Sequence, residues 1–441
     1  MFKKISVAAV VLSSLFFMPQ GWAGDLLRDI PFKISSQMWY APTGKLIPTP
    51  PAIIEKIKRV FDLWATVKEA RLAFHYDGLV DATYAGFHQI PRDGTIYVIL
   101  NNWEMGQCYD GLSEHWGVIP GSYGGGATVI NTQKGVHTVR SDILLHEIGH
   151  VLGIERHGAS PSNVMSAAGN AWNINEYLFL SEQDRADLLA KWDPGFPGLY
   201  SISGKVDTAL PEQKTDETKM ASVFAVDVGN GHAYSAKTDQ NGRFTVSLLK
   251  AGNYRIFAKA PEAFYYQQPA PQSPSWYICD GQSSNDPYSG RVLHVDASHR
   301  NIKDLEIKMI DRPVPFNLFN AGETYGKDRP FCFMRPGDQT RVQIQSKGLV
   351  SVESYGEHPD YALSHLEAEP QYKETCFANV VADPKAEPGE RLVIAKGQPG
   401  EVVQAGLVGI DVVEGLPKRI SYGSVQEIEA QVQGKIDLNP S

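Results

Sequence analysis

The sequence predicts an α+β domain followed by two β-sandwich domains, and three observations support this. Up to about residue 195, helical and strand-like segments alternate. Beyond that point, short alternating apolar and polar runs are separated by turn residues, as is typical of β-sandwiches. The 441 residues fit about three domains of about 150 residues, and a hydrophobic content of 42% can supply their cores. We therefore expect domains at residues 24–195, 196–311 and 312–421, with a polar tail at 422–441.

The first domain should combine a mixed sheet with three helices. A strand is expected at residues 30–35 (IPFKIS), and residues 51–67 have helical spacing with Pro51 at the favoured first position. A second helix should carry an apolar series at Ile143, Leu144, Leu145, Ile148, Val151 and Leu152. The other expected elements are a buried strand at 95–100, short strands at 114–120 and 127–131, and a helix at 180–192.

Turn residues mark the two following domains. Asn241-Gly242 lies between two strand-like runs and is a strong hairpin signal. This region resembles the prealbumin-like domains that are appended to carboxypeptidases as regulatory modules. The third region has the same pattern and resembles an immunoglobulin-like sandwich. Two roles remain open for both domains: a spacer that adds stability, or a module that binds a substrate, a glycan or a surface.

The N-terminus predicts export. Lys3 and Lys4 precede an apolar run at residues 5–18, and Ala23 ends a stretch suited to signal peptidase. We expect a signal peptide at 1–23 and a secreted or periplasmic protein, with the two locations left open. No later stretch of about 18 apolar residues predicts a membrane span. The formal charge of −9 gives no basic surface for nucleic acid, and a monomer is expected.

Four cysteines occur in this exported chain. In an oxidising compartment Cys332 and Cys376 are expected to form a disulfide bond within one β-domain. A bond between Cys108 and Cys279, which would link two domains, stays open.

One short segment carries most of the chemical information. His146 and His150 are four residues apart, so on a helix both imidazoles project from one face and can bind one zinc ion. Glu147 then lies beside that ion. Gly153 suits a helix end that turns the chain back, which returns His157 toward the metal. The alternative is a chance pair of histidines on an ordinary helix.

These residues resemble the metzincin metallopeptidases, and within them the matrixins, over about 170 residues. The family motif is H-E-x-x-H-x-x-G-x-x-H followed by a methionine turn. Arg156 stands at the position of the family's third histidine, and His157 follows one residue later. From His157 to Met165 the spacing is eight, as in a matrixin, so we assign the third ligand to His157. If its imidazole does not reach the metal, the site has two histidines and weak affinity.

The resemblance implies a role for each residue of the motif. His146, His150 and His157 would hold zinc, Glu147 would activate a zinc-bound water, and Met165 would lie beneath the metal. In such a fold an edge strand binds extended substrate, and residues 116–118 (Trp116, Gly117 and Val118) correspond to it.

The expected function is that of a secreted zinc metalloendopeptidase, a hydrolase acting on proteins or peptides. The alternative is a secreted binding or adhesion protein without catalysis that acts through its β-domains. The sequence leaves the substrate and the cleavage specificity undetermined.

Overall fold

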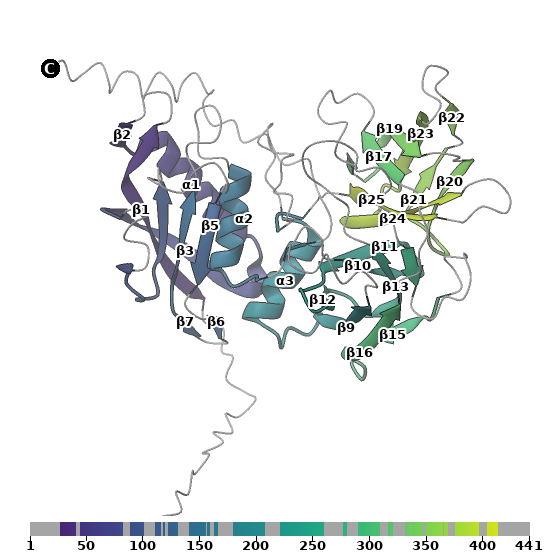
Figure 1. The fold of residues 1–441 in the computed structure, drawn as a ribbon, viewed down its shortest axis with the longest axis horizontal. Coiled ribbons are helices and arrows are strands. Elements are labelled where there is room, and N and C mark those ends of the chain that lie inside the picture. The colour runs from purple at the N-terminus through teal and green to yellow at the C-terminus, as the bar shows by residue number, and fades with distance from the viewer. Residues whose placement is uncertain are drawn as a thin grey trace, which may run out of the picture.

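The structure is a computed structural model in which three α-helices and many β-strands are described (Figure 1). The described residues are 27–40, 45–82, 89–100, 111–115, 118–119, 122–130, 141–155, 157–158, 163–165, 180–207, 221–259, 277–279, 290–308, 316–320, 331–334, 336–346, 350–364, 366–368, 375–396 and 404–412.

The N-terminal unit is built on a six-stranded mixed sheet with the order β2-β1-β4-β8-β5, in which β3 also pairs with β1. The long strand β1 runs parallel to β3 and β4, and β4 runs parallel to β8. Strands β2 and β5 pair antiparallel at the two ends. The bounds are β1 Arg28–Tyr40, β2 Lys45–Pro48, β3 Leu72–Val80, β4 Ile96–Leu100, β5 Gly111–His115 and β8 Gly126–Ile130, with a separate pair β6 Val118–Ile119 and β7 Ser122–Tyr123.

Helix α1 (Pro51–Ala65) buries one face against this sheet and is followed by a single 3-10 turn, η1 (Lys68–Ala70). Its buried apolar residues recur at helical spacing: Ile53, Ile57, Val60, Phe61 and Trp64. Phe61 stacks on Phe32 of β1 with ring centroids 4.0 Å apart, so the helix and the sheet share one core.

Three aromatic side chains fix helix α2 (Ser141–Val151) by donating hydrogen bonds to its carbonyls. Trp64 Nε1 donates to Leu145 O at 3.1 Å. Tyr123 Oη and Trp192 Nε1 donate to the carbonyls of Val151 and Leu152 at the C-terminal end, where a helix has no internal donors left. The side chains of α2 are therefore presented from a rigid support.

Helix α3 (Glu182–Trp192) begins with a capping box at Ser181 and Asp184. The Ser181 hydroxyl accepts from the Asp184 amide at 3.1 Å, and Asp184 accepts from the Ser181 amide at 2.9 Å. The helix lies between the N-terminal unit and the β-rich remainder of the chain (Figure 1).

The β-rich part contains a nine-stranded sheet flanked by two smaller sheets. The nine strands follow the order β14-β13-β10-β11-β24-β25-β18, with β15 on β13 and β20 on β24, and the smaller sheets are β12-β9-β16 and β17-β19-β23-β21 with β22 on β23. The bounds are β9 Tyr200–Asp207, β10 Ser222–Asp227, β11 His232–Lys237, β12 Arg243–Leu248, β13 Gly252–Lys259, β14 Tyr277–Cys279, β15 Leu293–Val295, β16 Asn301–Lys308, β17 Phe316–Asn320, β18 Phe331–Met334, β19 Gln339–Ser346, β20 Ser351–Ser354, β21 Tyr361–Leu363, β22 Glu367–Ala368, β23 Thr375–Ala382, β24 Gly389–Lys396 and β25 Gln404–Val412.

Strand β10 is buried on both faces, which explains its continuous apolar sequence. Val223 and Ala225 face the core under β12-β9-β16, whereas Phe224 and Val226 pack with Tyr355 and Leu392 on the other side. The core that contains Phe224, Val226, Tyr355 and Leu392 therefore joins residues from both sides of the expected domain boundary between residues 311 and 312.

The predicted fold class, a metzincin-like α+β domain followed by two β-sandwich domains, was wrong. Strands dominate the described chain, and the two expected sandwiches share one sheet because β11 pairs with β24 through His232↔Arg391 and Ala233↔Glu390. Alternating sequence predicts where strands are, but it does not predict which distant strands pair. The boundaries themselves remain predictions.

Two further expectations concern cysteines and membrane spans. Cys376 is a free thiol, so the predicted bond with Cys332 is not formed, and Cys108 lies outside the described residues. Burial raises the pKa of the Cys376 thiol. Among the described helices, none is both long and apolar enough to cross a membrane.

Candidate metal centre

Three histidines converge at the end of helix α2. His146 and His150 lie one turn apart, and their ring centroids are 4.8 Å from each other. The ring of His157 lies 5.1 Å from that of His146 and 5.0 Å from that of His150. The three imidazoles thus form a nearly equilateral triangle, and one nitrogen from each lies within 4.8 Å of the others. The chain returns at Gly153, whose φ of 90° is in the region that glycine readily adopts.

The spacing of the nitrogens fits a single metal ion. His150 Nε2 and His157 Nε2 are 3.1 Å apart. A tetrahedral zinc ion with Zn–N bonds of about 2.1 Å places two ligand nitrogens about 3.4 Å apart. The residue inserted before His157 therefore does not prevent that imidazole from joining the other two.

Backbone carbonyls fix the orientation of two imidazoles. His146 Nδ1 donates to Val164 O at 2.8 Å, and His150 Nδ1 donates to Ile154 O at 2.7 Å. A carbonyl accepts only, so these Nδ1 atoms carry the ring protons and each Nε2 keeps a lone pair for a metal. Burial lowers the pKa of His146 well below its usual value, and His150 and His157 lower it further. A neutral imidazole is the form that binds metal.

Met165 packs against helix α2 at Gly149. A Cβ atom at Gly149 would collide with Met165 Sδ and would lie 3.0 Å from Trp64 Cζ2. Gly149 therefore leaves the space that Met165 fills. Gly158 N donates to Met165 O at 2.6 Å, which closes the loop after His157.

Asp184 of α3 anchors this loop from below. Its carboxylate accepts from the amides of Val164 and Met165 at 2.9 and 3.2 Å, and from the Ser181 hydroxyl at 2.7 Å. Burial raises the pKa of Asp184, and these donors oppose that rise. Because Val164 also accepts from His146, the carboxylate of α3 helps to set the ring position of that histidine.

The other predicted site residues are placed as follows. Glu147 is buried next to His146 on α2, with 8% of its surface exposed. Val118 lies in β6, whereas Trp116 and Gly117 lie outside the described residues. Sequence reasoning missed Gly149 and Asp184, because their roles depend on contacts with Met165 and with the loop before it.

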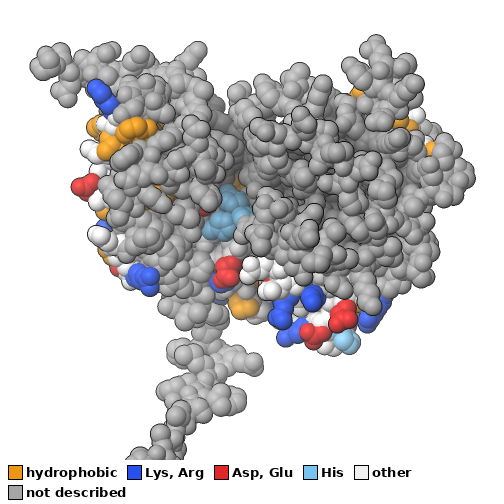
Figure 2. Space-filling model, in the orientation of Figure 1, with side chains coloured by type: hydrophobic (Ala, Val, Ile, Leu, Met, Phe, Trp, Pro, Cys, Tyr) orange, Lys and Arg blue, Asp and Glu red, His pale blue; other side chains and the backbone are white. Residues whose placement is uncertain are grey.

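Histidine side chains reach the surface in the hollow between the N-terminal unit and the β-rich part (Figure 2). His146 is buried, whereas His150 and His157 are half-buried. The cluster is therefore open to solvent on one side.

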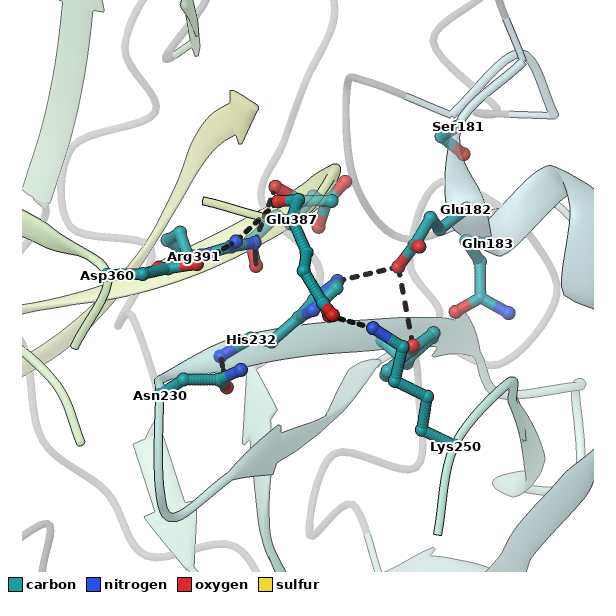
Figure 3. A network of polar contacts seen from close by, with 12 residues as sticks. Ser181, Glu182, Gln183, Asn230, His232, Lys250, Asp360, Glu387 and Arg391 are labelled. Carbon is teal, nitrogen blue, oxygen red and sulfur yellow. Dashed lines mark hydrogen bonds and ion pairs between the residues drawn. The ribbon is translucent and has the colours of Figure 1, made fainter. Parts of the chain in front are cut away.

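A polar network joins α3 to the β-rich part (Figure 3). His232 Nε2 of β11 lies 2.8 Å from Glu182 Oε2. Tyr234 Oη donates to the same carboxylate at 3.3 Å. On β24, Arg391 forms a bidentate pair with Asp360 at 2.7 and 2.6 Å. Lys250 pairs with Glu387 nearby, so three segments of the chain meet here.

Burial and neighbouring charges shift two pKa values in this network. Burial and the Arg391 cation lower the pKa of His232, although Glu182 opposes them. Burial acts to raise the pKa of Glu182, but His232, Lys250 and Arg391 outweigh it and the pKa is lowered. The pair is therefore a neutral imidazole beside a carboxylate at neutral pH.

None of the protein-family models or curated proteins compared with this chain matches it. Among solved structures, it is similar to a candidate adhesin from Bacteroides ovatus, with 11% identity over 51% of this chain and 86% of that chain and a TM-score of 0.17. It is also similar to the fimbrial anchor protein Mfa2 from Porphyromonas gingivalis, with 11% identity over 46% and 79% of the two chains and a TM-score of 0.16. A third is the pilus protein RrgB from Streptococcus pneumoniae, with 9% identity, a TM-score of 0.16, and coverage of 45% of this chain and 48% of that chain.

These findings contradict the predicted membership in the metzincin metallopeptidases. The prediction of a zinc metalloendopeptidase, with its description as a hydrolase and a matrixin-like metalloprotease, was wrong by the same comparisons. A motif of about twenty residues fixes the local geometry of three side chains, but it does not fix the family of a whole chain. The printed names of these structures are those of adhesion, fimbrial and pilus proteins, and TM-scores below 0.2 carry no argument about the role of this chain.

Proposed function

We propose that this chain is an exported binding protein whose N-terminal unit holds one zinc ion through His146, His150 and His157. The observation that supports this most strongly is the triangle of imidazoles with two Nδ1 atoms tied to carbonyls. Three neutral nitrogen donors suit zinc among the common metals of exported proteins. Export is supported by the predicted signal peptide at residues 1–23.

Three protein ligands leave a fourth coordination position on zinc. In this proposal a water molecule or a donor atom of a binding partner occupies it. The half-buried positions of His150 and His157 make that side of the ion accessible. Glu147, buried on the same helix, supplies negative charge close to the cation. The β-rich part is proposed to provide the surface that contacts a glycan, a protein or a cell surface.

Zinc binding to the purified full-length mature protein tests this function. Competition with a chromophoric chelator should give one zinc ion per chain. Replacing His146, His150 or His157 by alanine should lower the affinity by more than about 100-fold, since even loss of an outer partner of a ligand costs about 10–100-fold. Cobalt substitution should give the visible spectrum of a four-coordinate ion in the parent protein but not in these three variants.

His75→Ala is a matched control. His75 lies on β3 of the same unit and contacts Asp29 at 2.7 Å on the exposed surface, away from the cluster. It should bind zinc like the parent protein. Absence of stoichiometric zinc in the parent protein would reject the proposal, and parent-like affinity in His157→Ala would reduce the site to two histidines.

A further inference from the structure

A chain of buried hydrogen bonds leads from the histidine cluster into strand β11 of the β-rich part. Its first links are His146 Nδ1 to Val164 O and the amide of Val164 to Asp184. Asn163, which precedes Val164, is fully buried. Its side-chain amide donates to the Ser235 hydroxyl of β11 at 3.2 Å, and the Ser181 hydroxyl lies 3.1 Å from its carbonyl oxygen.

A second contact fixes the same strand position. The backbone amide of Ser235 donates to Gln183 Oε1 at 2.6 Å, and Gln183 Nε2 donates to Ser247 O of β12 at 3.4 Å. Both Ser235 and Gln183 are buried. Ser235 thus donates its amide to Gln183 of α3 and accepts at its hydroxyl from Asn163.

The sheet topology explains why the backbone amide of Ser235 does not pair with a neighbouring strand and can donate to Gln183. Strand β11 pairs with β10 along its length but with β24 only at His232 and Ala233. Beyond Ala233, the edge of β11 that faces α3 has no strand beside it among the described pairings. A buried strand edge needs partners for its amides, and the side chain of Gln183 provides one.

We propose that strand β11 is a positioning element of the metal site, with Ser235 holding the loop of Asn163, Val164 and Met165 in the place that orients His146. This inference rests on the proposed zinc site. The loop is held by Asp184 through the Val164 amide and by Ser235 through the Asn163 side chain, so release of either contact loosens the carbonyl that His146 uses. Zinc binding, in turn, should favour the arrangement in which β11 is docked.

Ser235→Ala in the full-length protein tests this coupling, because it removes the hydroxyl and adds no bulk. The zinc affinity should fall about 3–10-fold, less than the about 10–100-fold cost of a direct partner of a ligand, since Ser235 acts through intervening groups. In the metal-free protein, hydrogen exchange at the Val164 and Met165 amides should rise several-fold. Gln183→Ala, which leaves the Ser235 amide without this acceptor, should act in the same direction.

Two control variants separate positioning from loss of stability. Ser201→Ala removes another serine–asparagine contact of the β-rich part, an exposed one of 2.8 Å to Asn301. Ile256→Ala opens the core under β13 without touching the polar bridge. Neither should change zinc affinity or exchange at Val164 and Met165.

The outcomes distinguish the two proposals. If the parent protein binds no zinc, the proposed function fails, while faster exchange at Val164 and Met165 in Ser235→Ala still supports positioning by β11. If the parent protein binds zinc and Ser235→Ala and Gln183→Ala change neither affinity nor exchange, the positioning role is rejected and the zinc site stands. An equal loss of affinity in Ile256→Ala would also reject it, because general destabilisation would then suffice.

Discussion

Replacing Asp184 tests how strongly α3 holds the loop beneath the histidines. The fully buried carboxylate accepts hydrogen bonds from three backbone amides, those of Val164, Met165 and Ser181, and from the Ser181 hydroxyl. Asp184→Asn can keep one oxygen where Oδ2 now lies, which retains the contacts with Val164 and Ser181. Its NH₂ group would then face the Met165 amide, which currently lies 3.2 Å from Oδ1.

The two variants of Asp184 should differ in a predictable order. One buried amide without an acceptor costs about 1–3 kcal/mol, so Asp184→Asn should lower the free energy of unfolding by that amount. Asp184→Ala leaves three amides without their acceptor and should cost about 3–5 kcal/mol or more, even allowing for non-additivity. Zinc affinity should follow the same order, because the carbonyl of Val164 orients His146.

Urea denaturation of the metal-free protein, followed by zinc competition, measures both effects. Asp187→Asn is the control, since Asp187 lies on the same helix and accepts from Gln183 Nε2 at 3.0 Å. Equal destabilisation by Asp184→Asn and Asp187→Asn would refute the reasoning. So would an Asp184→Ala variant that loses stability but binds zinc like the parent protein.

Three further predictions concern the junction and the helix packing. The pKa values of His232 and Glu182 are lower in the fold than usual, so the unfolded chain binds protons at a higher pH than the folded protein does. The free energy of unfolding should therefore fall as the pH drops from about 7.5 to about 4, and His232→Phe should reduce this pH dependence in urea titrations. An unchanged pH dependence in His232→Phe would contradict the role given to the His232–Glu182 pair. Gly149→Ala should lower the free energy of unfolding by about 1–3 kcal/mol through overpacking against Met165 and Trp64, partly offset by about 1 kcal/mol because alanine favours the helix, and it should weaken zinc binding. Gly195→Ala, where a methyl group makes only an ordinary contact, should change neither stability nor zinc binding. Gly389→Ala should destabilise the protein more than Gly337→Ala in thermal melts, because both have positive φ but only the first methyl group would collide with the His232 ring; equal shifts in Tm would contradict this.

Local elements followed from the sequence, and long-range pairing did not. The helix expected at 51–67 is α1, the strand at 95–100 is β4, and the helix at 180–192 is α3, all within a few residues. Their apolar periodicity records which face is buried. The pairing of β11 with β24 cannot be predicted from such a pattern, because a strand edge forms hydrogen bonds through its backbone whatever its sequence.

In the candidate site, too, the local arrangement could be predicted and the long-range contacts could not. The convergence of His146, His150 and His157 could be predicted, since helical spacing and a turn at Gly153 determine it within a dozen residues. Asp184 and Ser235 could not be predicted as supports, because they lie 20 and 72 residues from the loop atoms they hold. The family resemblance, which was drawn over about 170 residues, was wrong for a related reason: its most specific part was the short segment from His146 to Met165.

The first turn of α3 explains why the metal site and the β-rich part should behave as one structure. Three consecutive residues there point in different directions, since successive side chains on a helix are about 100° apart. Glu182 contacts His232, Gln183 holds Ser235, and Asp184 holds the loop at Val164 and Met165. A movement of β11 must therefore move this turn or break its buried contacts, and either event alters the support of His146. We infer that the proposed zinc site depends on the assembled chain and not on its N-terminal unit alone.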